Sequence, residues 1–214
     1  MEPAPIEVLQ NFPKNTKERI LRTAAELFAA QGYHATGVAE LGRAAGIQRG
    51  ALYYHIRSKE ELLFELCKRH VEDAVVFGEE VLAGDAEPAE KLRQLIHRHL
   101  RMIVEHRAEI IVSFREMHSL TGGRAEYFHQ LRDRYEAIVR AILQEGVERG
   151  QFRSADSIVV NGLLGLISYA YLWLDPNGPL SPDDVAERFA DLALHGLAVT
   201  EPFACTSLDE EVDR

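Results

Sequence analysis

Apolar residues recur every three or four positions along most of the chain, a spacing that is typical of amphipathic α-helices. The pattern is clearest between Phe128 and Leu143, where the apolar side chains would share one face of a helix. No segment shows the alternation of apolar and polar residues that indicates a strand. The sequence therefore predicts an all-α protein. Besides the helix from Phe128 to Gly146, we expect helices at residues 15–31, 58–82, 88–106, 157–173 and 181–197, a shorter one at 110–120, and a break at Thr121-Gly122-Gly123.

Residues 36–63 predict two short helices around a glycine turn, followed by a longer helix. In the first short helix, Val38, Leu41 and Ala45 fall on one inward face. Gly46 allows the chain to turn, because glycine adopts backbone conformations that other residues disfavour. The second short helix then begins at Gln48. This arrangement is typical of a helix-turn-helix, which points to DNA binding.

The second short helix carries polar groups on the face opposite Leu52, which we expect to be buried. Gln48 and Arg49 lie at its N-terminal end, where the recognition helix of such a motif meets base edges. Tyr54 and His55, at the other end, suit contacts with phosphate groups. The face is therefore a candidate surface for reading DNA.

The next helix begins with a capping box, formed by Ser58 and Glu61. Lys59 lies beside the N-terminal amides of this helix, so both are available to a phosphate group. The helix continues into the second half of the chain. We expect it to transmit a small pivot from a ligand in that half to the DNA-binding residues.

Three ordered motifs carry a family resemblance: G-Y-x-x-T from Gly32, A-G-I-x-x-G-x-L-Y-Y-H from Ala45, and S-K-E-E-L from Ser58. Together they resemble the DNA-binding domain of TetR-family regulators. The resemblance implies an all-helical homodimer in which a small molecule in the C-terminal domain controls binding to operator DNA. It also implies roles for individual residues, which with Gln48 give the expected DNA-binding set: Thr36, Gln48, Arg49, Gly50, Ala51, Tyr53, Tyr54, His55 and Lys59.

Four positions depart from the family pattern. Gly37 stands where Thr or Ser is frequent, Gly42 where Ala is usual, Ala51 where Ser or Thr is common, and Ile56 where Phe is common. Glycine inside a helix costs about 0.5–1 kcal/mol relative to alanine, and Ala51 has no hydroxyl to offer a phosphate. We expect the ordinary geometry of the family with fewer polar contacts to DNA.

The charge of the chain is divided unevenly. The net charge is −10, yet residues 14–59 hold 8 Lys and Arg against 3 Asp and Glu, which leaves +5 there and −15 elsewhere. A basic surface releases counterions from DNA phosphates, whereas an acidic body is repelled by the duplex. We expect the protein to approach DNA with its N-terminal end.

These observations suggest four segments. Residues 1–13 are expected to be a disordered tail, 14–60 the DNA-binding domain, 61–200 a helical ligand-binding and dimerisation domain, and 201–214 a mobile tail. Cys67 and Cys205 show no paired spacing, so neither a disulfide framework nor a zinc site is indicated. The N-terminus lacks the pattern of a secretion signal, and the apolar run at 158–174 is too short to span a membrane. We expect a cytoplasmic protein without a membrane partner.

The last two predicted helices have little charge on one side. Small residues there permit close approach of a second subunit, so we expect a two-fold interface, with burial within the same subunit as the alternative. The residues expected at the interface are Gly162, Gly165, Tyr169, Phe189, Leu192, Ala193 and Gly196.

The short helix predicted at 110–120 combines polar and apolar residues in a way that suits a ligand pocket. A solvated edge with an internal ion pair would give the same pattern. Aromatic residues in the later helices are candidates for the same pocket, and membership of the core is the alternative for them. The candidate ligand-binding residues are Phe114, Arg115, Met117, His118, Tyr135, Ser168 and Tyr171.

Catalysis and resident metal ions are not indicated. His97 and His99 diverge around their predicted helix, and His99 and His106 share a face but lie two turns apart, too far for one ion without ligands from elsewhere. No phosphate loop, nucleophile motif or carboxylate pair is present. We expect no cofactor and no enzymatic activity.

The order FREMHSL, LRDRY, EGVERGQF and YLWLDPNGPLSPDDVAERFADLALHGL resembles TetR-type repressors that respond to acyl-CoA thioesters. The resemblance implies that Arg115, Arg132 or Arg134 meets the CoA phosphates. The expected function is that of a repressor that leaves a palindromic operator when an acyl-CoA or other apolar effector binds. The alternatives are a constitutive DNA-binding protein without an effector, and a helical small-molecule carrier or enzyme.

Overall fold

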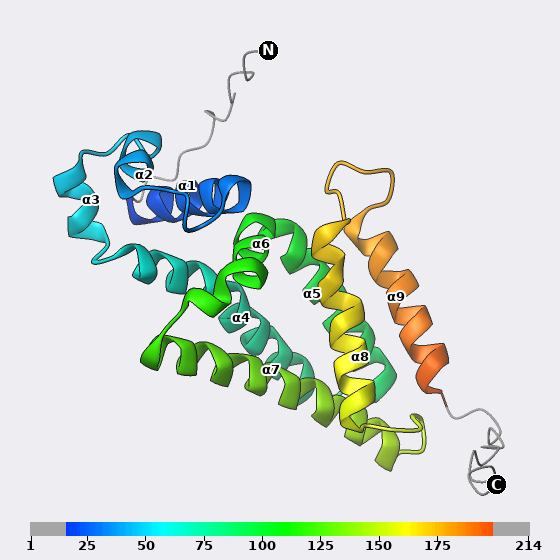
Figure 1. Ribbon diagram of the computed structural model, residues 1–214. Coiled ribbons are helices and arrows are strands. Elements are labelled where there is room, and N and C mark those ends of the chain that lie inside the picture. Colours follow the sequence, from blue (N-terminus) through cyan, green and yellow to red (C-terminus); the bar gives the residue numbers. More distant parts are fainter. Residues whose placement is uncertain (1–15, 199–214) are drawn as a thin grey trace, which may run out of the picture.

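The computed structural model describes residues 16–198, except for the side chain of Arg49. Within this part of the chain the structure is helical apart from turns and one isolated bridge between Phe152 and Ala198. The all-α prediction is confirmed (Figure 1). In chain order the helices are α1 (Thr16–Gln31), α2 (Val38–Ala44), α3 (Arg49–His55), α4 (Lys59–Ala83), α5 (Pro88–Glu105), α6 (Arg107–Glu116), η1 (Met117–Ser119), α7 (Gly122–Glu148), α8 (Ser157–Ser168), η2 (Tyr169–Leu172) and α9 (Pro182–Leu197), where η marks a 3-10 helix.

The first three helices form a small N-terminal unit around a shared apolar core. Phe28 of α1, Leu41 of α2 and Leu52 of α3 are each no more than 1% exposed. Gly46 has a φ of +65° and turns the chain between α2 and α3. The N–H of Ile47 donates to the carbonyl of Gly42 at 2.8 Å, and a Cβ on Gly42 would lie 3.0 Å from the Ile47 carbonyl. Gly42 therefore allows a close approach at this turn.

Helix α4 connects the N-terminal unit to the rest of the protein, as Figure 1 shows. Leu62 and Leu63 near its start, and Val75 and Val81 farther along, are all buried. Its N-cap is Ser58, whose hydroxyl accepts from the N–H of Glu61 at 3.0 Å. The reciprocal bond of the predicted capping box shifts by one residue, because the Glu61 carboxylate accepts from the N–H of Arg57 at 2.7 Å.

The C-terminal unit is a bundle built around α4 and α5. Helix α7 packs along α4, and α9 packs along α5. Helices α8 and α9 lie next to each other at the outer edge of the bundle (Figure 1). The fold therefore places the DNA-reading candidates at one end and the α8–α9 surface at the other.

The starts of two helices differ from the sequence prediction. Helix α6 begins at Arg107, directly after α5, instead of near Ile110. The break predicted at Thr121-Gly122-Gly123 is present at Thr121, the N-cap of α7, but both glycines belong to the first turn of that helix. The carboxylate of Glu60 on α4 accepts from both the N–H and the hydroxyl of Thr121. This contact, which fixes the start of α7, joins residues too far apart in sequence for a local pattern to reveal.

The last apolar helix also ends earlier than predicted, because α8 gives way to the 3-10 helix η2 at Tyr169. The predicted tails at 1–13 and 201–214 lie outside the described residues. Among the helices of residues 16–198, none combines the length and the apolar character that crossing a membrane requires.

Candidate nucleic-acid interface and internal cavity

Helix α3 presents one exposed face. Leu52 is fully buried, whereas Gly50, Ala51 and Tyr53 are exposed and Tyr54 is 86% exposed. Gln48, the N-cap of α3, is also exposed. These positions lie on the side of the helix that the sequence analysis expects to face DNA. His55 closes the helix, with its ring edge-on to that of Tyr54 at 5.2 Å.

Two residues of the expected DNA-binding set are engaged within the protein instead. Thr36 is 1% exposed, and its hydroxyl donates to the carbonyl of Gly32 at 2.8 Å, so a contact with DNA at this position would have to use the backbone. The Lys59 ammonium donates to the carbonyl of His34 at 3.5 Å and lies 4.3 Å from the centre of the Tyr33 ring. Partial burial lowers the pKa of Lys59. In this structure both residues hold the segment before α2 in place.

Sequence reasoning overlooked two basic residues on the same end of the molecule. Arg43 in the last turn of α2 and Arg57 between α3 and α4 are both exposed. Each was visible as part of the basic segment, but neither lies in a motif position that drew attention. Gly37, the N-cap of α2, has no side chain with which to cap the helix.

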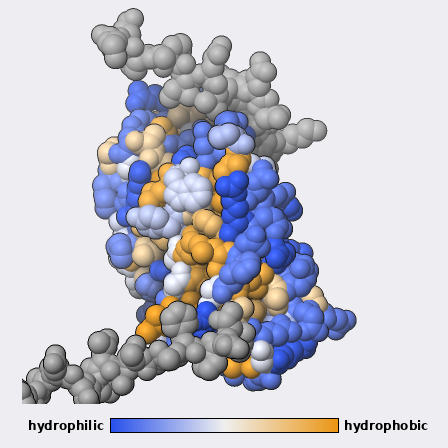
Figure 2. Space-filling view, turned by 90° about the vertical axis from the view of Figure 1, so that its right-hand side faces the viewer, coloured by the Kyte–Doolittle hydropathy of each residue, from blue (hydrophilic) through white to orange (hydrophobic). Residues whose placement is uncertain are grey.

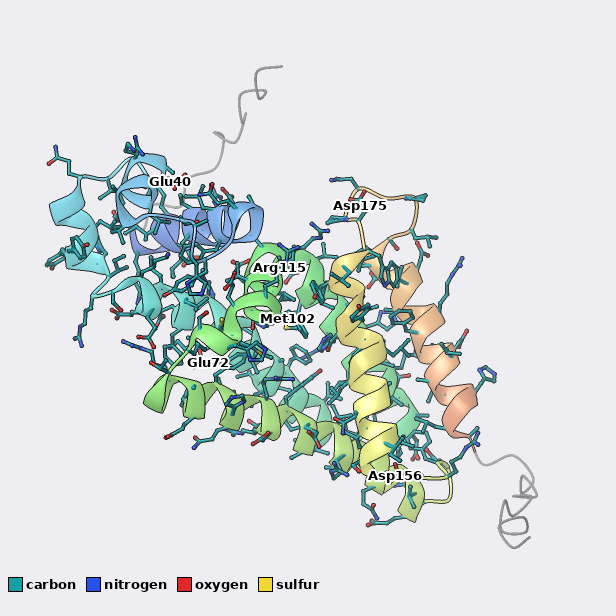
Figure 3. The ribbon with its side chains drawn as sticks, viewed as in Figure 1. Glu40, Glu72, Met102, Arg115, Asp156 and Asp175 are labelled. Atoms are coloured by element: carbon teal, nitrogen blue, oxygen red, sulfur yellow. The ribbon has the colours of Figure 1, made fainter. Side chains whose placement is uncertain are left out.

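The C-terminal unit encloses a cavity of about 450 Å³. Its wall contains residues from α4, α5, α6, α7 and α8, and Met102 can be followed into the interior in Figure 3. Four of the seven predicted ligand-binding residues line it: Phe114, Met117, Tyr135 and Ser168. Arg115, His118 and Tyr171 do not line the cavity, although the Tyr171 ring stacks on that of Phe114 at 4.6 Å.

A hydrogen-bonded chain of three side chains crosses one part of this wall. The Tyr135 hydroxyl lies 2.9 Å from Nδ1 of His99, and the Ser168 hydroxyl lies 3.3 Å from Nε2 of the same ring. Tyr135 and His99 are each 6% exposed. Desolvation lowers the pKa of His99 to about 3 and raises the pKa of Tyr135 far above its usual value. The chain is therefore uncharged at neutral pH.

A second buried histidine lines the cavity from α4. His70 is 6% exposed, and burial lowers its pKa to about 4. The sequence analysis considers His99 only as a possible metal ligand and does not single out His70. A signal was present, since His99 lies four residues from Leu95 and Ile103, and His70 lies four residues from Leu66, each on an apolar stripe.

The helix that forms part of the cavity wall also contacts the N-terminal unit. Arg115 of α6 donates to the carbonyl of Ala29 at 3.1 Å, and Figure 3 shows it at the boundary of α1 and α6. The carboxylate of Glu116 accepts from the N–H of Tyr33 at 3.2 Å. Arg115, predicted to face a ligand, is thus turned toward α1 because α6 packs against that helix.

The outer surface of α8 and α9 is apolar and exposed. Tyr169 is 63% and Leu192 60% exposed, and Gly162, Gly165 and Gly196 are also exposed. Figure 2 shows an orange and pale strip on this side of the molecule, bordered by hydrophilic residues. Phe189 is half-buried next to Trp173, and Ala193 is 8% exposed. Ala193 therefore packs within its own subunit rather than on the surface, where sequence analysis placed it. Ile158, Leu172 and Trp173 extend the exposed apolar surface.

The predicted helix with three histidines separates them into different environments. His97 contacts Asp183 and Glu187, and His99 belongs to the cavity wall. His106 lies between α5 and α6, with its ring near the carboxylates of Asp73 and Glu109. Across residues 16–198, no three His, Cys, Asp or Glu side chains converge in a way that could hold a metal ion. Cys67 is buried, which raises the pKa of its thiol to about 12, and Cys205 lies outside the described residues.

Known proteins match both units. Residues 20–66 match the family of bacterial regulatory proteins called tetR, and residues 85–197 match the tetracyclin repressor-like C-terminal domain. The HTH-type transcriptional repressor KstR2 of Rhodococcus jostii is 29% identical over 185 residues, which cover 85% of this chain and 91% of that repressor.

Solved structures show the same relationship. The TetR-family regulator PfmR of Thermus thermophilus superposes with a TM-score of 0.78 at 36% identity, over 85% of this chain and all of that one. The regulator AibR, solved with isovaleryl coenzyme A and operator DNA, superposes with a TM-score of 0.71 at 25% identity, over 86% of this chain and 98% of that one. The protein therefore belongs to the TetR family and is a DNA-binding transcriptional regulator, not an enzyme.

Proposed function

We propose that the protein is a homodimeric repressor that binds a palindromic operator through α3 of each subunit and leaves it when an apolar effector enters the cavity. The observation that carries the proposal is the double role of the segment formed by α6 and η1. One side of this segment lines the cavity, and the other is bonded to the N-terminal unit.

The coupling between the two sites follows from neighbouring residues of this segment. Phe114 and Met117 line the cavity, whereas Arg115 and Glu116, which lie between them, hold Ala29 and Tyr33. An effector that displaces Phe114 or Met117 would shift the same backbone that positions the end of α1. Because packed helices resist gradual deformation, such a shift favours a second arrangement of the DNA-binding units.

The dimer is supported by the exposed apolar surface of α8 and α9. Leu192 and Tyr169 would lose their contact with water in a two-fold interface, which offers a physical reason for their exposure in the single subunit. A helix-turn-helix dimer reads two half-sites about 34 Å apart, so pairing through the far end of the molecule leaves both α3 helices available to DNA.

An acyl-CoA is the effector class we favour, since the relative AibR was solved with isovaleryl coenzyme A. Of the three arginines that the sequence suggested for the CoA phosphates, Arg115 is bonded to Ala29 and Arg134 to Glu79. Arg132 lines the cavity, is exposed, and donates to the sulfur of Met117 at 3.5 Å. Arg132 is therefore the best placed of the three to bind an anionic group at the cavity mouth.

A mobility-shift experiment tests the proposal. Purified protein is bound to the DNA upstream of its own coding sequence and then titrated with short-, medium- and long-chain acyl-CoAs. We expect one range of chain length to release the DNA. Retention of DNA with every thioester would reject the acyl-CoA effector, and no binding at low salt would reject the operator assignment.

A further inference from the structure

We propose that the cavity recognises an uncharged oxygen on an otherwise apolar molecule, and that the Ser168 hydroxyl, held by His99 and Tyr135, donates a hydrogen bond to it. The ligand class is thus a neutral molecule or segment with a carbonyl, rather than a carboxylate or a plain hydrocarbon. The inference rests on the proposed function only in taking this cavity as the effector site.

The hydrogen-bonded series formed by Tyr135, His99 and Ser168 has one polar hydrogen that is not used within the series. Tyr135, neutral His99 and Ser168 each carry one polar hydrogen, and the two contacts that join them use two of the three. Within the described part of the chain, neither hydroxyl has a further side-chain partner. Whichever tautomer His99 adopts, the hydroxyl of either Tyr135 or Ser168 keeps a hydrogen that it can donate to a ligand.

The geometry favours Ser168 as that end. Tyr135 and His99 are 6% exposed, while Ser168 is only partly buried, and all three line the cavity. If the Tyr135 O–H donates to Nδ1 of His99, then Nε2 carries the ring hydrogen and donates to the Ser168 oxygen. The Ser168 O–H is then directed by its partners and available to a ligand acceptor.

The charge of the surroundings disfavours a carboxylate at this position. His99 and His70 remain uncharged at neutral pH because both are buried. Arg132 is the one Lys or Arg among the described residues that line the cavity, and it is exposed. A carboxylate beside Ser168 would lose its hydration without gaining a buried cation, which is unfavourable, whereas a carbonyl needs only the one hydrogen bond offered.

The arrangement resembles a serine–histidine pair, but it is not suited to catalysis. In a hydrolase the histidine takes the serine proton and is stabilised by a carboxylate. Here the third member is a tyrosine hydroxyl, and a histidine whose pKa is about 3 holds a proton too weakly to act as a general base near neutral pH. Tyr135, His99 and Ser168 therefore bind and orient a ligand without reacting with it.

The test compares three probes of similar shape: 4-phenylbutan-2-one, butylbenzene and 4-phenylbutanoate. Binding to the full-length protein without DNA is measured by calorimetry. We expect the ketone to bind about three- to tenfold tighter than the hydrocarbon, the size of one net hydrogen bond, and roughly tenfold or more tighter than the carboxylate. Nitrogen-15 spectra of the bound His99 ring should show the hydrogen on Nε2.

Variants separate the hydroxyl from the shape of the cavity. Ser168→Ala should abolish the preference for the ketone over butylbenzene, and Ser168→Thr, which keeps a hydroxyl, should retain it. Ser113→Ala is the matched control, because Ser113 lines the same cavity but is not part of the hydrogen-bonded series of Tyr135, His99 and Ser168. Its preference should match that of the wild-type protein.

Equal affinity for ketone and hydrocarbon, tighter binding of the carboxylate, a preference that survives Ser168→Ala, or no binding of any probe would each overturn the inference. Its failure is distinguishable from that of the proposed function. Release of DNA by a thioester without a ketone preference would reject only the inference. A Ser168-dependent ketone preference without any effect on DNA binding would reject only the effector-controlled repressor.

Discussion

The two functional regions of this protein differ in where they keep their polar groups. On α3 the candidate groups are outside, and Tyr54 is 86% exposed. In the C-terminal unit the corresponding groups are inside, where His99 and Tyr135 are buried and bonded to each other. A change on the outer face should therefore affect binding without affecting folding. A change inside should affect both, because buried polar groups contribute to stability through their partners.

The largest effect is expected from an exposed residue far from α3. Leu192→Glu places a charge on the apolar α8–α9 surface and should prevent dimerisation, because the charge would have to be desolvated in the interface. Loss of the second half-site contact should lower operator affinity about 100-fold or more. Sedimentation velocity and fluorescence anisotropy with labelled operator measure the two effects. Val76→Glu, at an exposed position of α4, is the control and should leave the dimer intact.

The inner region should make stability depend on pH. Because the pKa of His99 is lower in the folded protein than its ordinary value near 6.5, the unfolded chain binds more protons between about pH 3 and 6.5. Stability should therefore fall as the pH falls through this window. His99→Gln should reduce the slope by up to about 1.4 kcal/mol per pH unit, as measured by urea unfolding between about pH 6.5 and 4.5.

Ser168→Ala provides the control for the pH experiment, because it alters the same cavity without removing a titrating group. Its slope should remain close to that of the wild-type protein. Unchanged slopes in both variants would mean that His99 gains no proton on unfolding, which contradicts its buried neutral state.

A smaller effect is expected from the outer face of α3. Tyr54→Ala should weaken operator binding by about 1.5 kcal/mol, or tenfold, through loss of one hydrogen bond to a charged phosphate. The thermal midpoint should be unchanged, because the side chain is 86% exposed. Tyr127 is an exposed tyrosine of α7, far from α3, and Tyr127→Ala should leave operator affinity unchanged. A marked loss of stability in the Tyr54 variant would break the distinction between the two regions.

The smallest effect concerns the contact between the regions. Glu116→Gln should weaken the bond to the N–H of Tyr33, since a neutral amide oxygen is a poorer acceptor than a carboxylate. We expect operator affinity without effector to change little and the effector-induced decrease to shrink by a few fold, on the order of 1 kcal/mol of coupling. Anisotropy titrations with and without an acyl-CoA measure this. A full response in the variant would exclude Glu116 from the coupling.

The helix-turn-helix could be predicted from sequence because its contacts are local. Leu41, Gly46 and Leu52 lie within a dozen residues, so helical spacing on each side of a glycine turn is enough to predict that both leucines face the same core. The direction of single polar groups was harder to predict. Thr36 turned inward because its hydroxyl found the Gly32 carbonyl, and no spacing rule distinguishes that outcome from a contact with DNA.

The cavity could be predicted only in part, because its wall is assembled from helices far apart in sequence. Phe114 and Tyr135 were recognised by their chemistry. His99 and Ser168 come together only after α5 and α8 have packed, and helical periodicity indicates a buried face without showing whether that face borders a void. The partner of Arg115, the carbonyl of Ala29, could not be predicted from sequence because it lies 86 residues away.

The most direct test of the account is whether the two regions affect each other equally. The acyl-CoA that binds most tightly is titrated into the protein by calorimetry, with and without operator DNA. The account predicts that operator weakens thioester binding by the same factor by which the thioester weakens operator binding, because a coupling free energy is reciprocal. Thioester affinity that is unchanged by operator would contradict the claim that the cavity controls α3.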